Sequence, residues 1–481
     1  MNFRVCLLFP VLLTALGFGS ASADQPQAEP PSLYIEGYTN QLSYQAGDEI
    51  TFHVSTTAPT WSLEISRLGA ETEQVWEKND LPGAAHPVPG NASSHGCGWP
   101  AAFSLAAPES WRSGYYEAVL RVADRGDEFI RRNRRTAESR LFFVIRSSQP
   151  GSNAKILLQL TTNTYNAYNN WGGHSLYAYH ARNKLQGVRV SFDRPLDGQF
   201  RNWELPFVAW AERNGYALDY AVNSDLEFRP ELLKHYKLVL SVGHDEYWSA
   251  PMRDHLEQYI QDGGNVAFFS GNTCCWQVRS EDEGRALVSY KQTYVVDPLF
   301  PGEDHRLLAT LWSHHLVGRP ENRLTGVGFL YGGYHRSHGQ FMDGAGAFTV
   351  HRPEHWVFAG AGLKAGDAFG GQNTIVGYEC DGCEMQWKDG LPFPTHRDGT
   401  PQSFVILGAC PARWHPADAL WYDRFPRDKG GEPIQGAAVM GVYTQGGTVF
   451  TCGSTDWAHG LKGDDPTTER ITRNLLDRLS Q

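Results

Sequence analysis

His244, Asp245 and Glu246 stand side by side and offer an imidazole and two carboxylates to one short loop. The apolar residues 238–242 before them predict a buried β-strand, and the apolar spacing within 249–262 after them predicts a helix. Open α/β sheets place active sites in loops at the carboxyl ends of their strands. These residues could instead cap the helix or pair within the core. Their crowding between a core strand and two aromatic residues favours a functional site.

A second polar stretch, 161–177, is rich in tyrosine and follows another apolar run at 155–160. It also stands at the carboxyl end of a predicted strand, so we expect it to face the loop with His244. Phenolate and carboxylate oxygens are hard, anionic ligands and suit Fe(III) better than zinc. A metal ion held there could polarise a carbonyl and activate a water, with a histidine as general base. Tyrosines in such loops are also common core residues, so the spacing alone leaves both interpretations open.

Other catalytic signatures are missing from the sequence. It contains no G-x-S-x-G nucleophile elbow, no P-loop and no dinucleotide-binding fingerprint. The turn that would carry a cysteine nucleophile of the glutamine-amidotransferase kind holds His244 to Glu246 instead. Histidine pairs with spacings tolerable for zinc lie in irregular sequence, so we expect surface or loop histidines there: His335 and His338, His351 and His355, and, as the weakest pair, His314 and His315.

The start of the chain has the features of a secretory signal peptide over residues 1–23. A charged beginning precedes an apolar run from 5 to 18 and an Ala21-Ser22-Ala23 cleavage site. Residues 24–32 are predicted to form a flexible leader. We therefore expect a secreted or periplasmic protein, and no later apolar run is long enough to span a membrane. The net charge of −11 argues against nucleic acid and anionic membrane surfaces as partners.

Of the eight cysteines, seven remain after removal of the signal peptide, because Cys6 lies within it. An odd number leaves at least one thiol free or paired between chains. Cys380-x-x-Cys383 lacks the second pair that a zinc ribbon requires. We expect the adjacent Cys274 and Cys275 to be buried, reduced thiols rather than a strained disulfide.

The hydrophobic pattern divides the rest of the chain into two parts. Short alternating strands separated by turns fill 33–148 and predict an all-β sandwich of immunoglobulin-like size. After a linker at 147–153, buried strands alternate with helical patterns across 153–481, which predicts a doubly wound, mostly parallel α/β domain. Residues 280–400 are less regular, and we expect them to form a long elaboration over the carboxyl edge of the sheet.

Several sequence blocks resemble the large (beta) subunit of N,N-dimethylformamidase and its wider family. They run in order from about 155 to 480, and the preceding β domain is similar in kind. The first two blocks are highly specific, and the others support them: Val242 to Trp248, Gly264 to Thr273, Tyr168 to Gly173, Ser191 to Pro195, Gly377 to Glu379, and Gly453 to Trp457.

This resemblance implies a glutamine-amidotransferase-like α/β domain and a mononuclear iron, Fe(III), held by two tyrosines and one glutamate. Carried over to this sequence, Glu246 is the carboxylate ligand and Tyr168 is one phenolate ligand. Tyr177 is the second phenolate ligand by position, with Tyr165 as its rival. His244 and Glu379 form the acid–base pair beside the metal. The family hydrolyses a small tertiary amide, so a small-molecule amide is the expected substrate.

We therefore expect an exported, metal-dependent hydrolase of a small amide or related C–N bond. A signal peptide for export is not a feature of a cytoplasmic amidase. Whether dimethylformamide itself is the substrate is therefore left open. The rival expectation is a non-catalytic exported protein whose aromatic-rich cleft binds a carbohydrate or small organic ligand. The sequence leaves open whether the chain forms a homo-oligomer, and it implies no small subunit.

The mature chain is expected to begin at Asp24, because cleavage after Ala21-Ser22-Ala23 removes the whole apolar run. N-terminal sequencing of protein recovered from the medium or periplasm checks this. Exported protein that still carries residues 5–18 would contradict it.

Overall fold

A computed structural model gives the structure of the protein. It describes residues 32–123, 136–337, 340–342, 344–416, 418–420 and 422–481. The predicted signal peptide at 1–23 and all but the last residue of the predicted leader at 24–32 lie outside this range.

Two β-sheets form the N-terminal part. One contains β1 (Ile35–Thr39), β3 (Glu49–Thr56) and β6 (Phe103–Ala106). The other contains, in spatial order, β2 (Ser43–Tyr44), β8 (Thr136–Ile145), β7 (Gly114–Ala123), β4 (Thr60–Leu68) and β5 (Thr72–Pro82). Neighbouring strands run antiparallel, except that β2 pairs parallel with β8. Both sheets bury side chains such as Phe52, Leu63 and Phe143 in one shared core. The predicted β-sheet character is confirmed, although one short helix, α1 (Ala92–His95), lies between β5 and β6.

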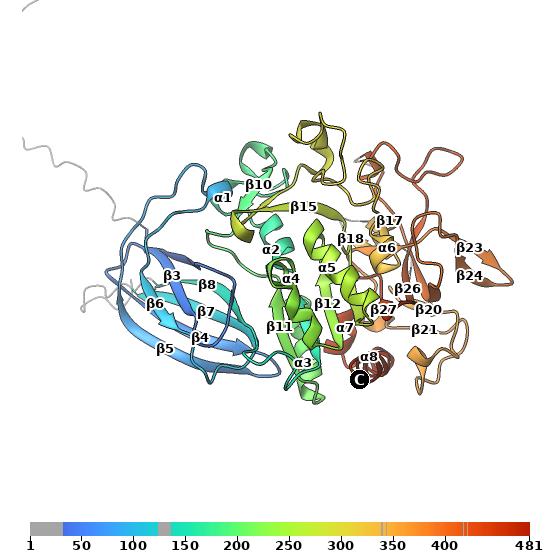
Figure 1. The fold of residues 1–481 in the computed structure, drawn as a ribbon, viewed down its shortest axis with the longest axis horizontal. Coiled ribbons are helices and arrows are strands. Elements are labelled where there is room, and N and C mark those ends of the chain that lie inside the picture. Colours follow the sequence, from blue (N-terminus) through green and yellow to red (C-terminus); the bar gives the residue numbers. More distant parts are fainter. Residues whose placement is uncertain (1–31, 124–135, 338–339, 343, 417, 421) are drawn as a thin grey trace, which may run out of the picture. The chain divides into compact units, whose positions relative to one another are not determined.

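A nine-stranded sheet organises the C-terminal part (Figure 1). Its spatial order is β11 (Leu218–Val222), β9 (Ile156–Leu160), β12 (Leu238–His244), β14 (Asn265–Gly271), β27 (Gly447–Thr451), β26 (Gly436–Gln445), β25 (Val405–Ala412), β20 (Phe348–Val350) and β21 (Ala368–Phe369). Neighbours from β11 to β27 are parallel, and neighbours from β27 to β21 are antiparallel. The sheet is therefore mixed, and the prediction of a mostly parallel sheet holds only for the half that includes β12.

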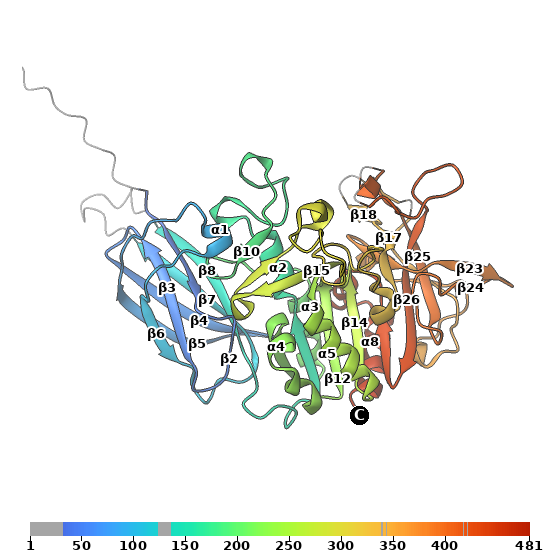
Figure 2. The same ribbon diagram turned by 45° about the horizontal axis from the view of Figure 1, so that its top comes forward.

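Helices cover both faces of the parallel half (Figures 1 and 2). Leu240 and Phe269 point into a core shared with α3 (Glu204–Arg213), α7 (Trp457–Lys462) and α8 (Pro466–Leu479). The neighbouring strand residues, such as Val239 and Phe268, point into a second core shared with α4 (Asn223–Phe228) and α5 (Ala250–Gln261). Because successive strand residues face opposite sides of a sheet, these cores lie on its two faces. The resemblance to glutamine amidotransferases stays a prediction.

The helix after β12 begins and ends close to the predicted residues. Ser249 caps α5, since its hydroxyl accepts a hydrogen bond from the backbone N–H of Met252 at 3.4 Å. Pro251 lies in the first turn, where its missing N–H costs nothing. Gly263, with a φ of 99°, follows the helix in the left-handed region that favours glycine.

The irregular elaboration predicted at 280–400 contains more sheet structure than expected. β15 (Trp276–Glu281) and β16 (Ala286–Val288) join β10 (Arg189–Ser191) and β13 (Tyr247–Ser249) in a four-stranded sheet. β20 and β21 extend the nine-stranded sheet. Residues 374–377 form no strand, because Thr374 has a left-handed φ of 51° and the next strand, β22, begins later. Other short elements of this region include α6 (Asn322–Thr325), β17 (Gly328–Gly333), β18 (Arg336–Ser337), β19 (Gln340–Phe341), β22 (Cys380–Gly382), β23 (Met385–Lys388) and β24 (Leu391–Pro394).

All seven cysteines from Cys97 to Cys452 are buried free thiols. The expectation of reduced thiols at Cys274 and Cys275 is therefore confirmed, and Cys380 and Cys383 do not form a disulfide with each other. Within the residues that the structure describes, no helix combines the length and the apolar character needed to cross a bilayer.

Buried polar groups join the N-terminal sheets to the α/β part. Arg67 Nη2 on β4 lies 2.5 Å from Glu212 Oε1 on α3. Ser43 Oγ on β2 donates a hydrogen bond to Asp225 Oδ2 on α4 at 2.6 Å. The domain limits predicted at 33–148 and 153–481 stay a prediction.

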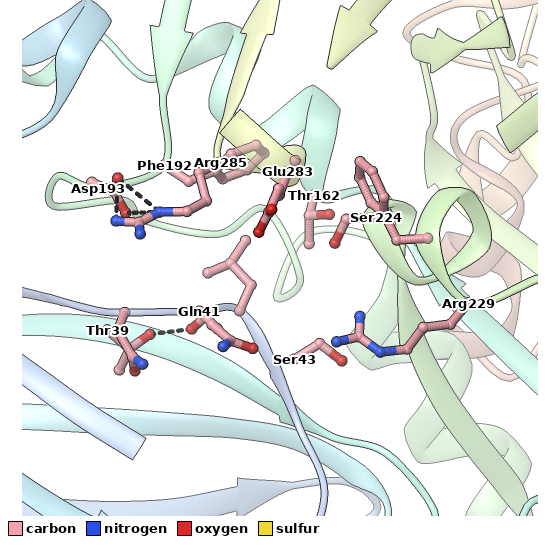
Figure 3. A pocket seen from close by; sticks show the side chains of 14 residues that line it. Thr39, Gln41, Ser43, Thr162, Phe192, Asp193, Ser224, Arg229, Glu283 and Arg285 are labelled. Carbon is pink, nitrogen blue, oxygen red and sulfur yellow. Dashed lines mark hydrogen bonds and ion pairs between the residues drawn. The ribbon is translucent and has the colours of Figure 1, made fainter. Parts of the chain in front are cut away.

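A cavity of about 410 Å³ lies near these contacts (Figure 3). Its wall mixes hydroxyl, amide and phenylalanine side chains with two arginines. Arg285 Nη2 lies 2.6 Å from Asp193 Oδ2, and Arg229 Nη1 lies 3.0 Å from Asp225 Oδ1. Both arginine charges thus have acidic partners, and no histidine or cysteine is among the described residues that line the cavity.

Replacement of Glu212 by glutamine is expected to lower the free energy of unfolding by about 2–3 kcal/mol. The change leaves Arg67, whose side chain is 3% exposed, without its anionic partner. The partial exposure of Glu212 keeps the effect below that of a fully buried pair. Denaturant unfolding measures the change. The matched control is Asp304→Asn, which removes an exposed ion pair with Arg306 and should leave the unfolding midpoint in place. Equal midpoints for the two variants would contradict the prediction.

Candidate metal centre

His244 and Glu246 lie at the carboxyl end of β12, as the sequence predicted. β12 runs to His244 and β13 begins at Tyr247, so only Asp245 and Glu246 separate the two strands. Gly243 has a φ of +83°, and a Cβ on this residue would lie 2.4 Å from the Cβ of Trp203, so the turn requires glycine. His244 and Glu246 are only 2% and 3% exposed.

Asp245, the middle residue of the three, is engaged elsewhere in the core. Its Oδ2 accepts hydrogen bonds from Ser241 Oγ at 2.7 Å and from Gln159 Nε2 at 3.2 Å. Burial raises the pKa of this carboxyl to about 6, although these hydrogen bonds act in the opposite direction. Asp245 therefore has a structural role beside the candidate site.

Tyr168 and Tyr177 come from the tyrosine-rich stretch after β9. Tyr168 is the last residue of α2 (Thr162–Tyr168), and Tyr177 lies in the chain that follows. Thr164 Oγ1 on α2 accepts a hydrogen bond from the backbone N–H of Glu246 at 2.9 Å. This bond fixes the end of α2 against the Glu246 loop.

The hydroxyl oxygens of both tyrosines meet the carboxylate of Glu246. The Oη atoms of Tyr168 and Tyr177 lie 2.7 Å apart. Tyr168 Oη is 3.0 Å from Glu246 Oε2, and Tyr177 Oη is 2.9 Å from each carboxylate oxygen. The structure thus brings together the three side chains that the sequence proposed as metal ligands.

Tyr165, the rival for the second tyrosine position, points away from this cluster. Its hydroxyl donates a hydrogen bond to Glu204 Oε1, and its ring packs in the core that includes Phe207 on α3. Tyr165 lies on α2 three residues before Tyr168. Residues with this spacing lie on the same side of a helix, but the hydroxyl of Tyr165 meets Glu204 rather than Glu246.

His244 and Glu379 lie against the same carboxylate. His244 Nε2 is 2.7 Å from Glu379 Oε2 and 3.3 Å from Glu246 Oε2. These are ion-pair distances, but neither His244 Nε2 nor Glu379 Oε2 has an aligned hydrogen bond among the described residues. Burial acts to lower the pKa of His244, but the charges of Glu379 and Glu246 outweigh it and raise this pKa to about 10.

The electrostatics of the cluster keep both phenols protonated in the protein alone. Burial, and then the charge of Glu246, raise the pKa values of Tyr168 and Tyr177 well above their ordinary value. Burial also raises the pKa of Glu379, against the effect of His244. The pKa of Glu246 is lowered despite its burial, because His244 and Lys291 favour the charged form. An added cation is the kind of group that would stabilise phenolates here.

Three further residues of the cluster were not predicted. Trp276 Nε1 donates a hydrogen bond to Glu246 Oε1 at 2.7 Å. Lys291 Nζ donates to Tyr247 Oη at 3.0 Å, and Tyr247 Oη donates to Tyr177 Oη at 2.8 Å. The position of Tyr247 next to Glu246 was a usable signal. Lys291 lies in irregular sequence that gives no indication of its neighbours.

The cluster opens onto a cavity of about 390 Å³. Besides the cluster residues, its wall is mostly aromatic, with an asparagine after β14 and a histidine and an aspartate from one further segment: Tyr179, Asn272, Phe329, Tyr334, Tyr378, His415 and Asp418. This volume and lining suit a small organic molecule with an apolar part.

These residues fit a mononuclear Fe(III). Two phenol oxygens and a carboxylate form a hard donor set, and oxygens separated by 2.7–3.0 Å can share one ion. An octahedral ion with bonds of about 2.0 Å sets neighbouring ligand oxygens about 2.8 Å apart. The buried His244 Nε2 and Glu379 Oε2 also lack aligned hydrogen bonds in the described part of the chain, which leaves polar capacity for a further group in the cavity.

A second group of metal-binding residue types lies elsewhere. One ligand atom from each of His314, His315 and Asp423 lies within 4.8 Å of the others. His314 lies in a loop, as one of the two alternatives predicted, but it is only 1% exposed and is therefore not a surface histidine. Burial, and then the charge of His315, lower the pKa of His314 to about 4, which keeps its imidazole neutral.

The other histidine pairs form no comparable group in the described residues. His335 Nδ1 lies 2.8 Å from the carbonyl oxygen of Pro411, and His355 Nδ1 accepts a hydrogen bond from the backbone N–H of Val357. His351 packs against the ring of Trp387. His338 lies outside the described residues.

Comparison with known proteins places the chain in a family. Residues 62–470 match the family described as "N,N-dimethylformamidase beta subunit-like, C-terminal", and the chain belongs to this family. The match begins within β4, so it includes much of the N-terminal sheets as well as the α/β part.

Two curated relatives are named as the beta subunit of N,N-dimethylformamidase. The protein from Alcaligenes sp is 25% identical over 437 residues, and the protein from Paracoccus aminophilus is 24% identical over 446 residues. Each match covers 80% of this chain and 54% of the relative. The chain therefore spans about half the length of the curated relatives it matches.

Proposed function

We propose that this protein is an exported, iron-dependent hydrolase of a small amide or a related C–N bond. The observation that carries the proposal is the close contact of Tyr168, Tyr177 and Glu246, whose oxygens lie 2.7–3.0 Å apart. Membership of the N,N-dimethylformamidase beta subunit-like family supports it. The export proposal rests on the signal-peptide features of residues 1–23.

Tyr168, Tyr177 and Glu246 would hold the Fe(III) ion. When bound, such an ion polarises the amide carbonyl and lowers the pKa of a water molecule. Tyr247 and Trp276 orient this ligand set through their hydrogen bonds to Tyr177 and Glu246. Metal ligands positioned in this way keep their geometry through the reaction.

His244 and Glu379 would carry the proton of the attacking water. In the protein alone the pKa of His244 is about 10, so its imidazole would be protonated near neutral pH. A cation held by Tyr168, Tyr177 and Glu246 would lower this pKa, because its charge opposes that of Glu246. Neutral His244 Nε2 would then accept this proton as water adds to the carbonyl carbon, and would give it to the departing amine nitrogen. Glu379, 2.7 Å from Nε2, stabilises the imidazolium between the two transfers. The C–N bond breaks, and the products are a carboxylic acid and an amine.

The aromatic wall of the cavity would bind the amide and limit the access of water. Tyr334 is 4% exposed, and the ring of Tyr378 packs against His244 with centroids 5.7 Å apart. Excluding water strengthens the electrostatic effects of the buried carboxylates. The volume of about 390 Å³ accommodates small-molecule amides of more than one size.

Glu246→Gln is expected to remove most of the iron, the tyrosinate-to-iron colour and the amidase activity together. Glutamine keeps the size of the side chain but removes its charge, and anionic oxygen is the ligand that Fe(III) prefers. Iron per chain by elemental analysis and the visible spectrum measure the effect. Tyr177→Phe should behave in the same way, whereas Tyr165→Phe, three residues before Tyr168, should keep iron and colour.

Two results would overturn the metal assignment. One is a colourless, iron-free wild-type protein from iron-replete cells, which a non-catalytic ligand-binding protein would give. The other is a Glu246→Gln protein that retains the full iron content of the wild type.

His244→Ala is expected to retain iron and colour but to lose about 10²–10⁴-fold in kcat, the usual contribution of a general base. His244 lies beside the ligand cluster without being part of it, so metal content and rate should separate. Parallel iron analysis and amide hydrolysis assays measure both quantities. A variant with wild-type kcat would remove His244 from the mechanism.

A further inference from the structure

We propose that His314, His315 and Asp423 bind a second, divalent metal ion of the zinc class, which clamps one wall of the aromatic cavity. This site is separate from the Tyr168, Tyr177 and Glu246 cluster, and it does not depend on the proposed amidase activity. Its geometry, a buried unsatisfied nitrogen and the positions of its two chain segments carry the proposal.

The three side chains converge from two segments more than a hundred residues apart in the sequence. One ligand atom from each lies within 4.8 Å of the others. The rings of His314 and His315 stack with centroids 4.5 Å apart and planes at 26°. Asp423 is exposed, so its carboxylate can rotate toward the two imidazoles. Zinc ligands lie about 2.0–2.2 Å from the ion and therefore within about 4.4 Å of one another, so a small side-chain rotation would complete the site.

Hydrogen bonds hold both imidazole rings in place. His314 Nδ1 accepts a hydrogen bond from the backbone N–H of Leu316 at 3.3 Å. His315 Nδ1 lies 3.3 Å from the hydroxyl of Tyr422, which also accepts a hydrogen bond from the backbone N–H of His315 at 3.0 Å. Outer contacts of this kind orient histidines at metal sites.

The second observation is a nitrogen without a partner. His314 is 1% exposed, and its Nε2 has no hydrogen bond to any described residue. A buried polar atom that lacks a partner costs folding free energy unless an ion or water satisfies it. Because Nδ1 is already engaged, Nε2 is the atom that His314 has left to offer to a metal.

The donor set selects a different class of ion from the tyrosine cluster. Two imidazole nitrogens and one carboxylate suit zinc, cobalt or nickel, whereas three anionic oxygens suit Fe(III). Three protein ligands leave a zinc ion at least one position for water. The chain would therefore hold two ions of different chemistry at two places.

The position of the site indicates what the ion would do. Asp423 lies in the same segment as Trp414 and Phe425, which pack in one core cluster with Tyr247 and Trp276. His415 and Asp418 of this segment line the cavity of about 390 Å³. An ion shared by Asp423 and the two histidines would fix this segment to residues 312–318. It would thereby hold the cavity wall in place.

The test uses the full chain stripped of metal and titrated with Zn²⁺, with Co²⁺ as a spectroscopic probe. We expect one tightly bound Zn²⁺ per chain at this site. We also expect at least a tenfold weaker affinity in Asp423→Asn and in His315→Gln. Hydrogen exchange across 413–434 should slow on addition of Zn²⁺ to the wild type only. Neither variant removes the buried His314, so both are expected to fold.

Two matched controls separate this site from other carboxylates. Glu303→Gln removes an exposed acid from the neighbouring segment and should leave Zn²⁺ affinity unchanged. Glu246→Gln should also leave it unchanged, even where iron is lost. Wild-type protein that binds no Zn²⁺, or variants at Asp423 and His315 with undiminished affinity, would overturn the site. Zn²⁺ binding without slower exchange across 413–434 would overturn the clamp.

Discussion

The buried carboxylate of Glu246 is the group on which the rest of the site depends. A charge that is 3% exposed needs partners, because removing it from water is costly. Glu246 receives them from three parts of the chain: the two tyrosine hydroxyls after β9, the indole N–H of Trp276 on β15, and the imidazole of His244 at the end of β12. The positions of α2, β12 and β15 relative to one another therefore depend on the need to give one buried carboxylate its polar partners.

The mixed sheet explains why these partners can meet. β9, β12 and β14 run parallel, so the segments that follow them emerge at the same edge. The antiparallel half, from β27 to β21, brings a different part of the chain to this edge. Glu379 directly precedes β22. The backbone of Cys380 in β22 forms an isolated antiparallel β-bridge with Ser454, which lies just beyond β27. A fully parallel sheet would need a crossover connection for each strand, whereas antiparallel strands return to the edge directly.

Local sequence predicted those features that local interactions determine. The apolar patterns at 238–242 and 249–262 placed β12 and α5 correctly, because helix and strand periodicity is a property of neighbouring residues. The close approach of Tyr168, Glu246, His244 and Glu379 was predicted through the family resemblance rather than from their spacing. The metal and the roles of these residues stay predictions.

Features set by distant pairing could not be predicted in the same way. β20 and β21 are short, and only their partner β25 shows that they belong to the large sheet. Sequence position favoured Tyr177 but kept Tyr165 as its rival, because the choice depends on which neighbour each hydroxyl meets. Lys291 is a further example, since it lies 44 residues from Tyr247 and in a segment without periodicity. Lysine side chains are usually exposed, so the residue type does not indicate that Lys291 is buried.

The burial of all seven described thiols has a consequence for the life of the protein outside a reducing compartment. Burial raises the pKa of thiols such as Cys274 and Cys275, so little reactive thiolate forms while the chain stays folded. Oxidants can then reach these sulfurs only when part of the structure opens. In an oxidising compartment, the frequency of local opening, rather than the intrinsic chemistry of cysteine, would set the rate at which these thiols are oxidised.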